Sequence, residues 1–202
     1  MKFYPIHIDL KDKPCLVVGG GRVAERKIKK LCLAGATVTV ISKDFTPAIE
    51  QLQQAQKIMT LSRAFESGDV EGVFLVFAAT NNQTVNLQVC QEAQSKGILV
   101  NSVDSVDQGS FILPASCQVG ALQLGITTNG ESPALSARLR RYFQHKLSVL
   151  TPAMVEELAQ LRKEMVTAVE QENKVIATQK MNLAIDQMIE VLENQKVNVK
   201  DI

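Results

Sequence analysis

Cys15-Leu-Val-Val-Gly-Gly-Gly-Arg-Val-Ala24 is the stretch that decides the fold. Its first four residues are all apolar, which is typical of a strand buried on both faces. From Arg22 to Leu33 the apolar residues recur with a helical period, and Gly35 then ends the pattern, so an amphipathic helix is expected. Residues 37–41 form a second strand-like run, and the three elements together predict one right-handed strand-helix-strand unit.

The same alternation of apolar runs and helical patterns continues to residue 100. Thr46-Pro47 combines a capping threonine with proline at the first helical position, which predicts a helix to about Ala55. Strands that alternate with helices predict an open, largely parallel α/β sheet. The further elements expected here are strands near residues 58–61, 73–79 and 98–100 and a helix through Val85, Val89 and Ala93.

The pattern changes after Asp104. Residues 110–117 and 121–128 are two β-rich stretches with Gly120 in the short link between them, which predicts a hairpin. A capping residue followed by proline then opens two helices, and an apolar stripe marks a third. These helices are expected from Ser132-Pro133, from Thr151-Pro152 and through Ile185–Leu192, and the tail beyond Lys196 is expected to fray.

The glycines at residues 19–21 fit the dinucleotide pattern G-x-G-x-x-G/A in the strand-to-helix position that the pattern requires. Gly19 permits a tight turn, and Gly21 lets backbone N–H groups approach a pyrophosphate with no Cβ in the way. Ala24 lets the helix pack close to the sheet, and the N-terminus of that helix favours phosphate. The loop predicts a bound dinucleotide; a glycine turn that binds nothing is the alternative.

Other polar residues follow the strands that should end at the same edge of the sheet. Asp44 could accept hydrogen bonds from an adenosine ribose, whereas Lys43 could attract a 2′-phosphate, so the pair leaves the choice between NAD and NADP open. Thr80 and Asn81 are expected on the nicotinamide side. Asp104 could act as a general base beside the nicotinamide, and a surface loop aspartate is the ordinary alternative.

An acidic ligand is suggested by the segment that leads into the helix at Ser132-Pro133. Free N–H groups at a helix start can hold a carboxylate, and arginine forks bind carboxylates in bidentate fashion. A solvated charged face is the alternative. The residues expected to bind such a substrate are Thr128, Asn129, Gly130, Ser132 and Arg138.

The overall composition limits the partners. The formal net charge is +1, which gives no reason to expect nucleic acid, and no apolar run is long enough to predict a membrane span. The four cysteines are scattered without the close pairs that zinc sites use, so reduced cysteines in a cytoplasmic protein are expected. His7 and His145 are the two histidines, and no His/Cys cluster predicts a metal site.

Five segments, in order between Pro5 and Arg141, carry a resemblance to a known family: PIHIDLKDKPCLVVGGGRVAERKIKKL, FAATNNQTVN, VNSVD, GSFILPA and TTNGESPALSARLRR. The sequence resembles the precorrin-2 dehydrogenases, which also form the N-terminal part of bacterial siroheme synthases. The combination of VGGGxVAxRK, FxxPA and GxSPxLxxxLR is specific to this family.

The resemblance implies an α/β fold in three parts: an NAD-binding Rossmann domain over residues 1–112, a small α+β dimerisation domain over 113–148 and a helical C-terminal region over 149–202. It implies a homodimer that uses NAD⁺ to convert the tetrapyrrole precorrin-2 to sirohydrochlorin in siroheme biosynthesis. Fe²⁺ insertion, with Fe²⁺ as a substrate, is left open. The family's dinucleotide contacts match Arg22, Val23, Lys43 and Asp44, and its key aspartate matches Asp104.

A protein that senses NAD without catalysis is the rival hypothesis. Its strand-helix-strand start would look the same, but it would need neither Asp104 nor the basic helix that begins at Ser132-Pro133.

Overall fold

The computed structural model describes residues 2–168 and 170–197 of the 202-residue chain. The chain divides into two compact units, Met1–Leu113 and Pro114–Ile202, and each is described by itself. The finer division into three domains, with boundaries after residues 112 and 148, stays a prediction. The expected fraying of the tail beyond Lys196 concerns mainly residues 198–202, which lie outside the described residues.

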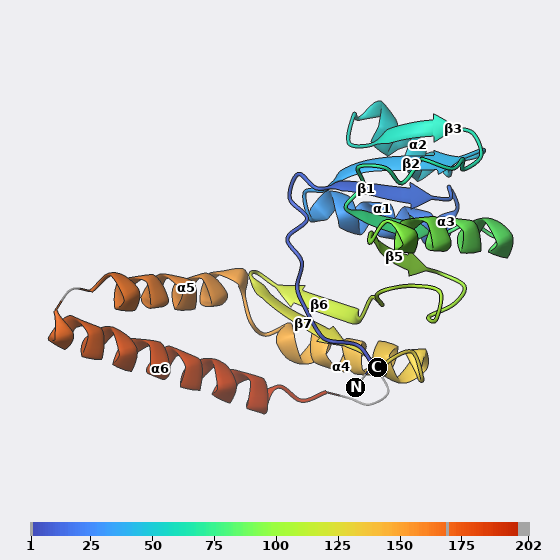
Figure 1. Ribbon diagram of the computed structural model, residues 1–202. Coiled ribbons are helices and arrows are strands. Elements are labelled where there is room, and N and C mark those ends of the chain that lie inside the picture. Colours follow the sequence, from blue (N-terminus) through green and yellow to red (C-terminus); the bar gives the residue numbers. More distant parts are fainter. Residues whose placement is uncertain (1, 169, 198–202) are drawn as a thin grey trace. The chain divides into compact units, whose positions relative to one another are not determined.

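A five-stranded parallel sheet forms the centre of the first unit (Figure 1). Its strands are β1 (Pro14–Val18), β2 (Thr37–Ser42), β3 (Met59–Ser62), β4 (Leu75–Ala78) and β5 (Leu99–Ser102). They lie in the order β3-β2-β1-β4-β5, so the chain runs outward from β1 and then returns to β4 on the other side of β1. The loops after β1 and β4 therefore leave the sheet at its switch point, where doubly wound sheets bind ligands. The prediction of a parallel α/β sheet is confirmed.

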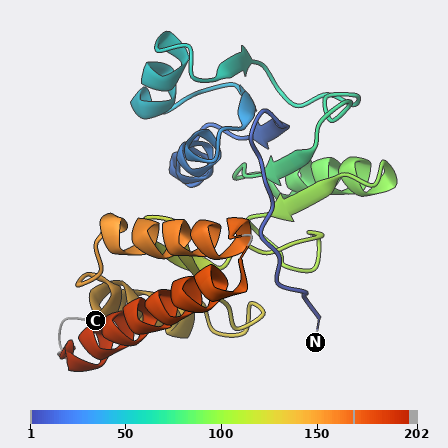
Figure 2. The same cartoon turned by 90° about the vertical axis from the view of Figure 1, so that its left-hand side faces the viewer.

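Three helices cover the two faces of this sheet: α1 (Arg22–Leu33), α2 (Pro47–Gln54) and α3 (Gln83–Ser95). Figure 2 shows α1 and α2 on one side of the sheet and α3 on the other. Ile28 of α1 and Ile49 of α2 pack in one core cluster with Val17 of β1, whereas Val89 of α3 packs with Val76 of β4 in the other. Both faces of β1 and β4 are thus covered, which is why these strands are continuously apolar.

The segment at residues 110–114 is where the predicted strand was wrong. It has no strand structure; instead Ser110 N–H donates to the Val100 carbonyl at 2.8 Å, and the Asn101 side chain donates to the Phe111 carbonyl at 3.0 Å. The Phe111 ring meets Phe77 edge-on, with centroids 5.7 Å apart. Residues 110 and 111 are therefore hydrogen-bonded to β5, and Phe111 packs against β4, so the segment does not continue the hairpin.

The second unit contains the predicted hairpin and three helices. Cys117, Leu147 and Leu150 form its buried core cluster. Ser132 and Thr151 accept hydrogen bonds from N–H groups in the first turns of α4 and α5, as predicted. The elements are β6 (Ala115–Val119), β7 (Leu122–Ile126), α4 (Pro133–Leu147), α5 (Pro152–Thr167) and α6 (Gln171–Asn194). Within residues 2–168 and 170–197, no helix has both the length and the apolar character that crossing a membrane requires.

Candidate active site

The glycine loop between β1 and α1 fits tightly against two neighbouring loops of its own sheet. Gly19 has φ +126°, and a Cβ there would lie 2.2 Å from the carbonyl oxygen of Ala79. A Cβ on Gly20 would lie 1.9 Å from the carbonyl oxygen of Asp44. A Cβ on Gly21 would meet no atom within 4 Å. The first two glycines are thus required by the protein's own backbone, whereas Gly21 keeps open the space that a ligand would use.

The N-terminus of α1 differs from those of the next two helices. Thr46 and Asn82 accept hydrogen bonds from backbone N–H groups of α2 and α3, but Gly21, at the same position of α1, makes no side-chain cap. Arg22 and Val23 are exposed in this first turn. The first N–H groups of a helix need partners, and a pyrophosphate can supply them. The residues present therefore fit a bound dinucleotide.

The loop after β2, which carries the exposed residues Lys43 and Asp44, is fastened to α1. Thr46 N–H donates to the Gly20 carbonyl at 3.0 Å, and the Thr46 hydroxyl donates to Glu25 at 2.8 Å. The ammonium of Lys29 also donates to Glu25, at 2.6 Å. These hydrogen bonds, that from Lys29 first, hold the pKa of the Glu25 carboxyl below its ordinary value. Lys43 and Asp44 are thereby kept beside the glycine loop.

The loop after β4 contains the predicted cofactor contacts Thr80 and Asn81. The Thr80 hydroxyl already donates within the loop, 2.8 Å from Asn86 Oδ1 and 3.0 Å from the Asn82 carbonyl. Asn81 is exposed. The structure therefore leaves Asn81 accessible, while the Thr80 side chain holds the loop together; both cofactor contacts stay predictions.

Asp104 follows β5 and reaches the loop after β4 through Asn86 of α3. The Asn86 side-chain amide donates to Asp104 Oδ2 and also to the Thr80 carbonyl, the latter at 3.0 Å. Asn86 is 0% exposed. The structure thus brings Asp104 and Thr80 together through a residue that the sequence analysis did not single out. The sequence did carry a sign that Asn86 is buried, because this polar residue lies on the same helical stripe as the apolar Val89.

The predicted substrate-binding residues lie in the second unit, around the start of α4. Thr128 Oγ1 accepts from Ser132 N–H at 2.9 Å, and Ser132 Oγ accepts from Leu135 N–H at 3.4 Å. Asn129 and Gly130 form the turn between them with positive φ values of 56° and 89°. This helix start is therefore partly satisfied by its own side chains, unlike that of α1. Arg138 is exposed on α4, one and a half turns further on.

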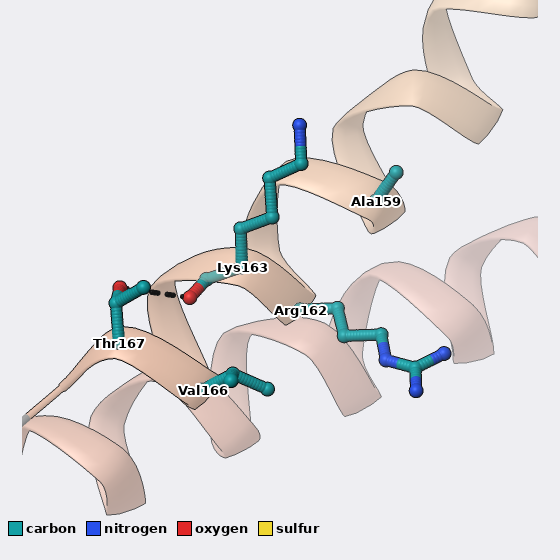
Figure 3. A pocket seen from close by; sticks show the side chains of 5 residues that line it. All are labelled: Ala159, Arg162, Lys163, Val166 and Thr167. Atoms are coloured by element: carbon teal, nitrogen blue, oxygen red, sulfur yellow. Dashed lines mark hydrogen bonds between the residues drawn. The ribbon is translucent and has the colours of Figure 1, made fainter.

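Metal-binding groups and surface hollows are two further places where a site could lie among the described residues. No group of three or more His, Cys, Asp or Glu side chains gathers there in a way that could hold a metal ion. Figure 3 shows an open hollow along α5, in which the Thr167 hydroxyl donates to the Lys163 carbonyl at 2.8 Å. The hollow is lined by Ala159, Arg162, Lys163, Val166 and Thr167.

Comparisons with known proteins agree with this geometry. Residues 6–115 match a family model described as "Putative NAD(P)-binding", and residues 119–144 match one described as "Sirohaem biosynthesis protein central". The chain is similar over its length to a solved structure described as "SirC, precorrin-2 dehydrogenase": the TM-score is 0.74, the sequence identity is 26%, and 99% of this chain and 100% of that chain are covered.

Curated relatives with higher identity are longer proteins. Siroheme synthase 1 of Serratia proteamaculans (strain 568) is 38% identical over 161 residues, which are 80% of this chain and 33% of the relative. The siroheme synthase of Vesicomyosocius okutanii subsp. Calyptogena okutanii (strain HA) is 40% identical over 161 residues, again 80% of this chain and 34% of the relative. The chain therefore spans about a third of the length of these relatives.

Proposed function

Since this chain belongs to the NAD(P)-binding family whose model spans residues 6–115, we propose that it uses NAD⁺ to dehydrogenate precorrin-2 to sirohydrochlorin in siroheme biosynthesis. The observation that carries the proposal is the likeness to a solved precorrin-2 dehydrogenase, which extends over 99% of this chain. The match of residues 119–144 to a sirohaem biosynthesis model supports the same assignment from the second unit.

The NAD⁺ site is proposed at the switch point of the sheet. The uncapped start of α1 and the open space at Gly21 support a pyrophosphate there. The exposed carboxylate of Asp44 at the end of β2 supports a ribose contact, as in NAD-binding proteins. The proposed cofactor-binding residues are Gly19, Gly21, Arg22, Val23, Lys43, Asp44, Thr80 and Asn81.

The proposed chemistry assigns the proton to Asp104. Bound NAD⁺ supplies the acceptor for a hydride that leaves one carbon of precorrin-2. Asp104 accepts the proton that leaves the neighbouring position, so that two hydrogens are lost and a new double bond extends the conjugation. This role is supported by the exposed carboxylate at the ligand-facing edge of the sheet, held there by Asn86.

The carboxylates of the substrate are assigned to the second unit. Thr128, Asn129, Gly130, Ser132 and Arg138 are proposed to bind them. The support is chemical: a turn followed by a helix start, with an exposed arginine on the same helix, offers N–H groups and a bidentate fork.

The assembly, the second substrate and the compartment also belong to this proposal. A homodimer is supported by large apolar side chains that α5 and α6 leave exposed, such as Val166 and Leu183. Fe²⁺ is a candidate second substrate, inserted into sirohydrochlorin, because the curated relatives are siroheme synthases. All four cysteines are free of disulfide bonds, which supports a cytoplasmic location.

An anaerobic spectroscopic assay tests the dehydrogenase directly. Purified protein is mixed with enzymatically generated precorrin-2 and NAD⁺, and Co²⁺ or Fe²⁺ is added in a second stage. We expect the spectrum of sirohydrochlorin to appear only when NAD⁺ is present. Metal insertion that the protein accelerates would add the chelatase. A folded, NAD-binding protein that produces no sirohydrochlorin would overturn the proposal in favour of an NAD sensor.

Asp104→Asn tests the assignment of the base. The variant keeps the shape of the side chain but cannot accept a proton, so kcat is expected to fall about 10²- to 10⁴-fold, with NAD⁺ affinity retained. The dissociation constant of NAD⁺ is measured by calorimetric titration in parallel. Turnover at the wild-type rate would remove Asp104 from the mechanism.

A further inference from the structure

Asn86 is a fully buried polar residue in the first turn of α3. A buried amide is costly unless its hydrogen bonds are made. Asn86 makes four: its Oδ1 accepts from Thr80 N–H at 3.1 Å and from the Thr80 hydroxyl at 2.8 Å, and its Nδ2 donates to the Thr80 carbonyl and to Asp104 Oδ2. Three of the four go to Thr80, so the Asn86 amide is bound firmly to the loop after β4.

The backbone of Thr80 fixes which way the amide points. A backbone N–H can only donate and a carbonyl oxygen can only accept, so Oδ1 must face the Thr80 N–H and Nδ2 must face the Thr80 carbonyl. The usual ambiguity between the two ends of an asparagine amide is therefore removed. The remaining N–H of Nδ2 is left for Asp104, and it can only donate.

We propose that Asn86 is a positioning residue for Asp104. By donating a hydrogen bond to the Asp104 carboxylate, Asn86 holds it at the ligand-facing edge of the sheet, at a fixed place relative to the loop after β4. The inference rests on the proposed role of Asp104 as the base. The contact reaches Oδ2 of the carboxylate, so Oδ1 remains for the substrate proton. The backbone supports the same placement, because Val103 N–H donates to the Ala78 carbonyl at 3.1 Å.

Cys90, one turn along α3, is a buried titratable side chain that senses the charge of Asp104. Burial raises the pKa of the Cys90 thiol; a hydrogen bond with Ser102 acts in the opposite direction, and the charge of Asp104 adds to the rise. Burial thus favours the neutral thiol form of Cys90. The side-chain amide of Asn86 donates a hydrogen bond to this carboxylate.

Asn86→Asp replaces the fixed donor with an acceptor of the same shape. The Oδ1 contacts to Thr80 can remain, but the second oxygen would face the Thr80 carbonyl and Asp104, which are both acceptors. We expect kcat of the dehydrogenation to fall about 10- to 100-fold because the base is displaced, with a smaller rise in the KM for NAD⁺ because Thr80, a proposed cofactor contact, loses one hydrogen bond. A purely structural role would instead raise the KM for NAD⁺ at least as much as it lowers kcat.

The matched control is Asn82→Asp in the same loop. An aspartate there can still cap α3 by accepting from Thr84 N–H and Val85 N–H, and it introduces the same charge without touching Asp104. Its kcat should stay within about twofold of wild type. An equal loss in both variants would overturn the inference, since the loss would then follow the added charge and not the lost donor.

The pH dependence of Asn86→Asp gives a second signature. The introduced carboxyl can donate to Asp104 only while it is protonated, and two carboxylates at one site repel each other. The ratio of variant to wild-type kcat should therefore fall as the pH is raised from about 5 to 8. A ratio that does not change with pH would contradict a role through the Asp104 carboxylate.

An NMR measurement tests the contact without any turnover. The side-chain amide signals of Asn86, assigned by their absence in Asn86→Asp, should shift in Asp104→Ala and stay in place in Asp107→Ala. Unmoved signals in Asp104→Ala would overturn the inference whatever the protein catalyses. If the signals shift but the wild-type protein makes no sirohydrochlorin, the proposed function fails while the contact stands. If Asp104→Asn loses turnover and Asn86→Asp does not, the positioning role alone fails.

Discussion

The two units of the molecule bury their apolar residues very differently. In the first unit, two core clusters line the two faces of the parallel sheet and include fully buried residues of its strands. In the second unit, the buried core cluster consists of Cys117, Leu147 and Leu150 with partly buried neighbours. Every residue of α5 and α6 is described, yet α5 has no buried residue and α6 has Ala177 alone.

The ion pairs divide in the same way. Among residues 2–168 and 170–197, every pair of Lys or Arg with a carboxylate within 4.0 Å lies in the first unit; Arg63–Asp69 and Lys96–Glu71 are examples. The first unit therefore holds its loops together with ion pairs among its own residues. The second unit leaves Val166 68% and Leu183 60% exposed. Single exposed apolar side chains are common, and Leu33 of the first unit is 89% exposed, so the support for the proposed homodimer is the scarcity of buried residues along α5 and α6.

Gly19→Ala tests the tight packing of the first unit and has the largest expected effect. The added Cβ would lie 2.2 Å from the Ala79 carbonyl oxygen, and φ at this position is +126°, which side chains disfavour. Overpacking and backbone strain together should lower the free energy of unfolding by roughly 2–6 kcal/mol. Urea unfolding followed by circular dichroism measures it, and NAD⁺ binding should be lost at the same time.

Gly21→Ala is the matched control, because its Cβ meets nothing within 4 Å. Its free energy of unfolding should stay within about 0.5 kcal/mol of wild type, while its NAD⁺ affinity falls because the methyl group enters the ligand space. Equal destabilisation by the two variants would mean that the loop is not held by its neighbours as described.

Ile28→Ala and Leu183→Ala compare the two units directly. Ile28 is 0% exposed in α1, so removing its side chain leaves a cavity and should cost roughly 2–5 kcal/mol of unfolding free energy. Leu183 of α6 is 60% exposed, and its removal should cost less than about 0.5 kcal/mol in dilute, monomeric protein. Urea unfolding at two protein concentrations measures both. A large cost at Leu183 that grows with concentration would show that α6 is covered by a second copy.

The part of the fold that local signals determine could be predicted from the sequence. The expected bounds of α1, Arg22–Leu33, agree with the structure, because a glycine loop starts this helix and Gly35 follows its end. The starts of α2, α4 and α5 were predicted equally well, since a capping side chain and a proline lie next to each other at each one. The predicted residues in the loops after β1, β2, β4 and β5 could be placed at one edge because parallel strands share that edge.

The features that depend on distant partners could not be predicted. Residues 110–114 have an apolar strand-like sequence. The Phe111 ring nevertheless packs against Phe77, 34 positions earlier in the chain, and the segment does not form a strand. Asn86 contacts Asp104 across 18 positions, and nothing in the helical period of α3 indicates that partner. The Glu25–Thr46 hydrogen bond, which fastens the loop after β2 to α1, is of the same kind.

Asp69→Asn tests the contribution of ion pairs to the first unit, and its expected effect is smaller than those of Gly19→Ala and Ile28→Ala. Arg63 donates to both oxygens of Asp69, at 2.6 and 2.8 Å, and Glu66 N–H donates to one of them at 2.8 Å. These bonds, that from Arg63 first, hold the pKa of the Asp69 carboxyl below its ordinary value. The pair therefore stabilises the folded state above about pH 4, the ordinary range of an aspartate. This contribution is lost as the pH falls through the lowered pKa.

The expected cost of Asp69→Asn is about 1–2 kcal/mol of unfolding free energy at pH 7, and the difference from wild type should shrink as the pH falls through the lowered pKa of Asp69. Urea unfolding over a series of pH values measures it. Asp107→Asn is the control, because Asp107 pairs with Lys2 in the open, where the Asp107 side chain is 84% exposed. Solvent screens such a pair, so no measurable change is expected there. A cost for Asp69→Asn that stays constant down to acid pH would mean that Arg63 and Asp69 stabilise the first unit through packing rather than through charge.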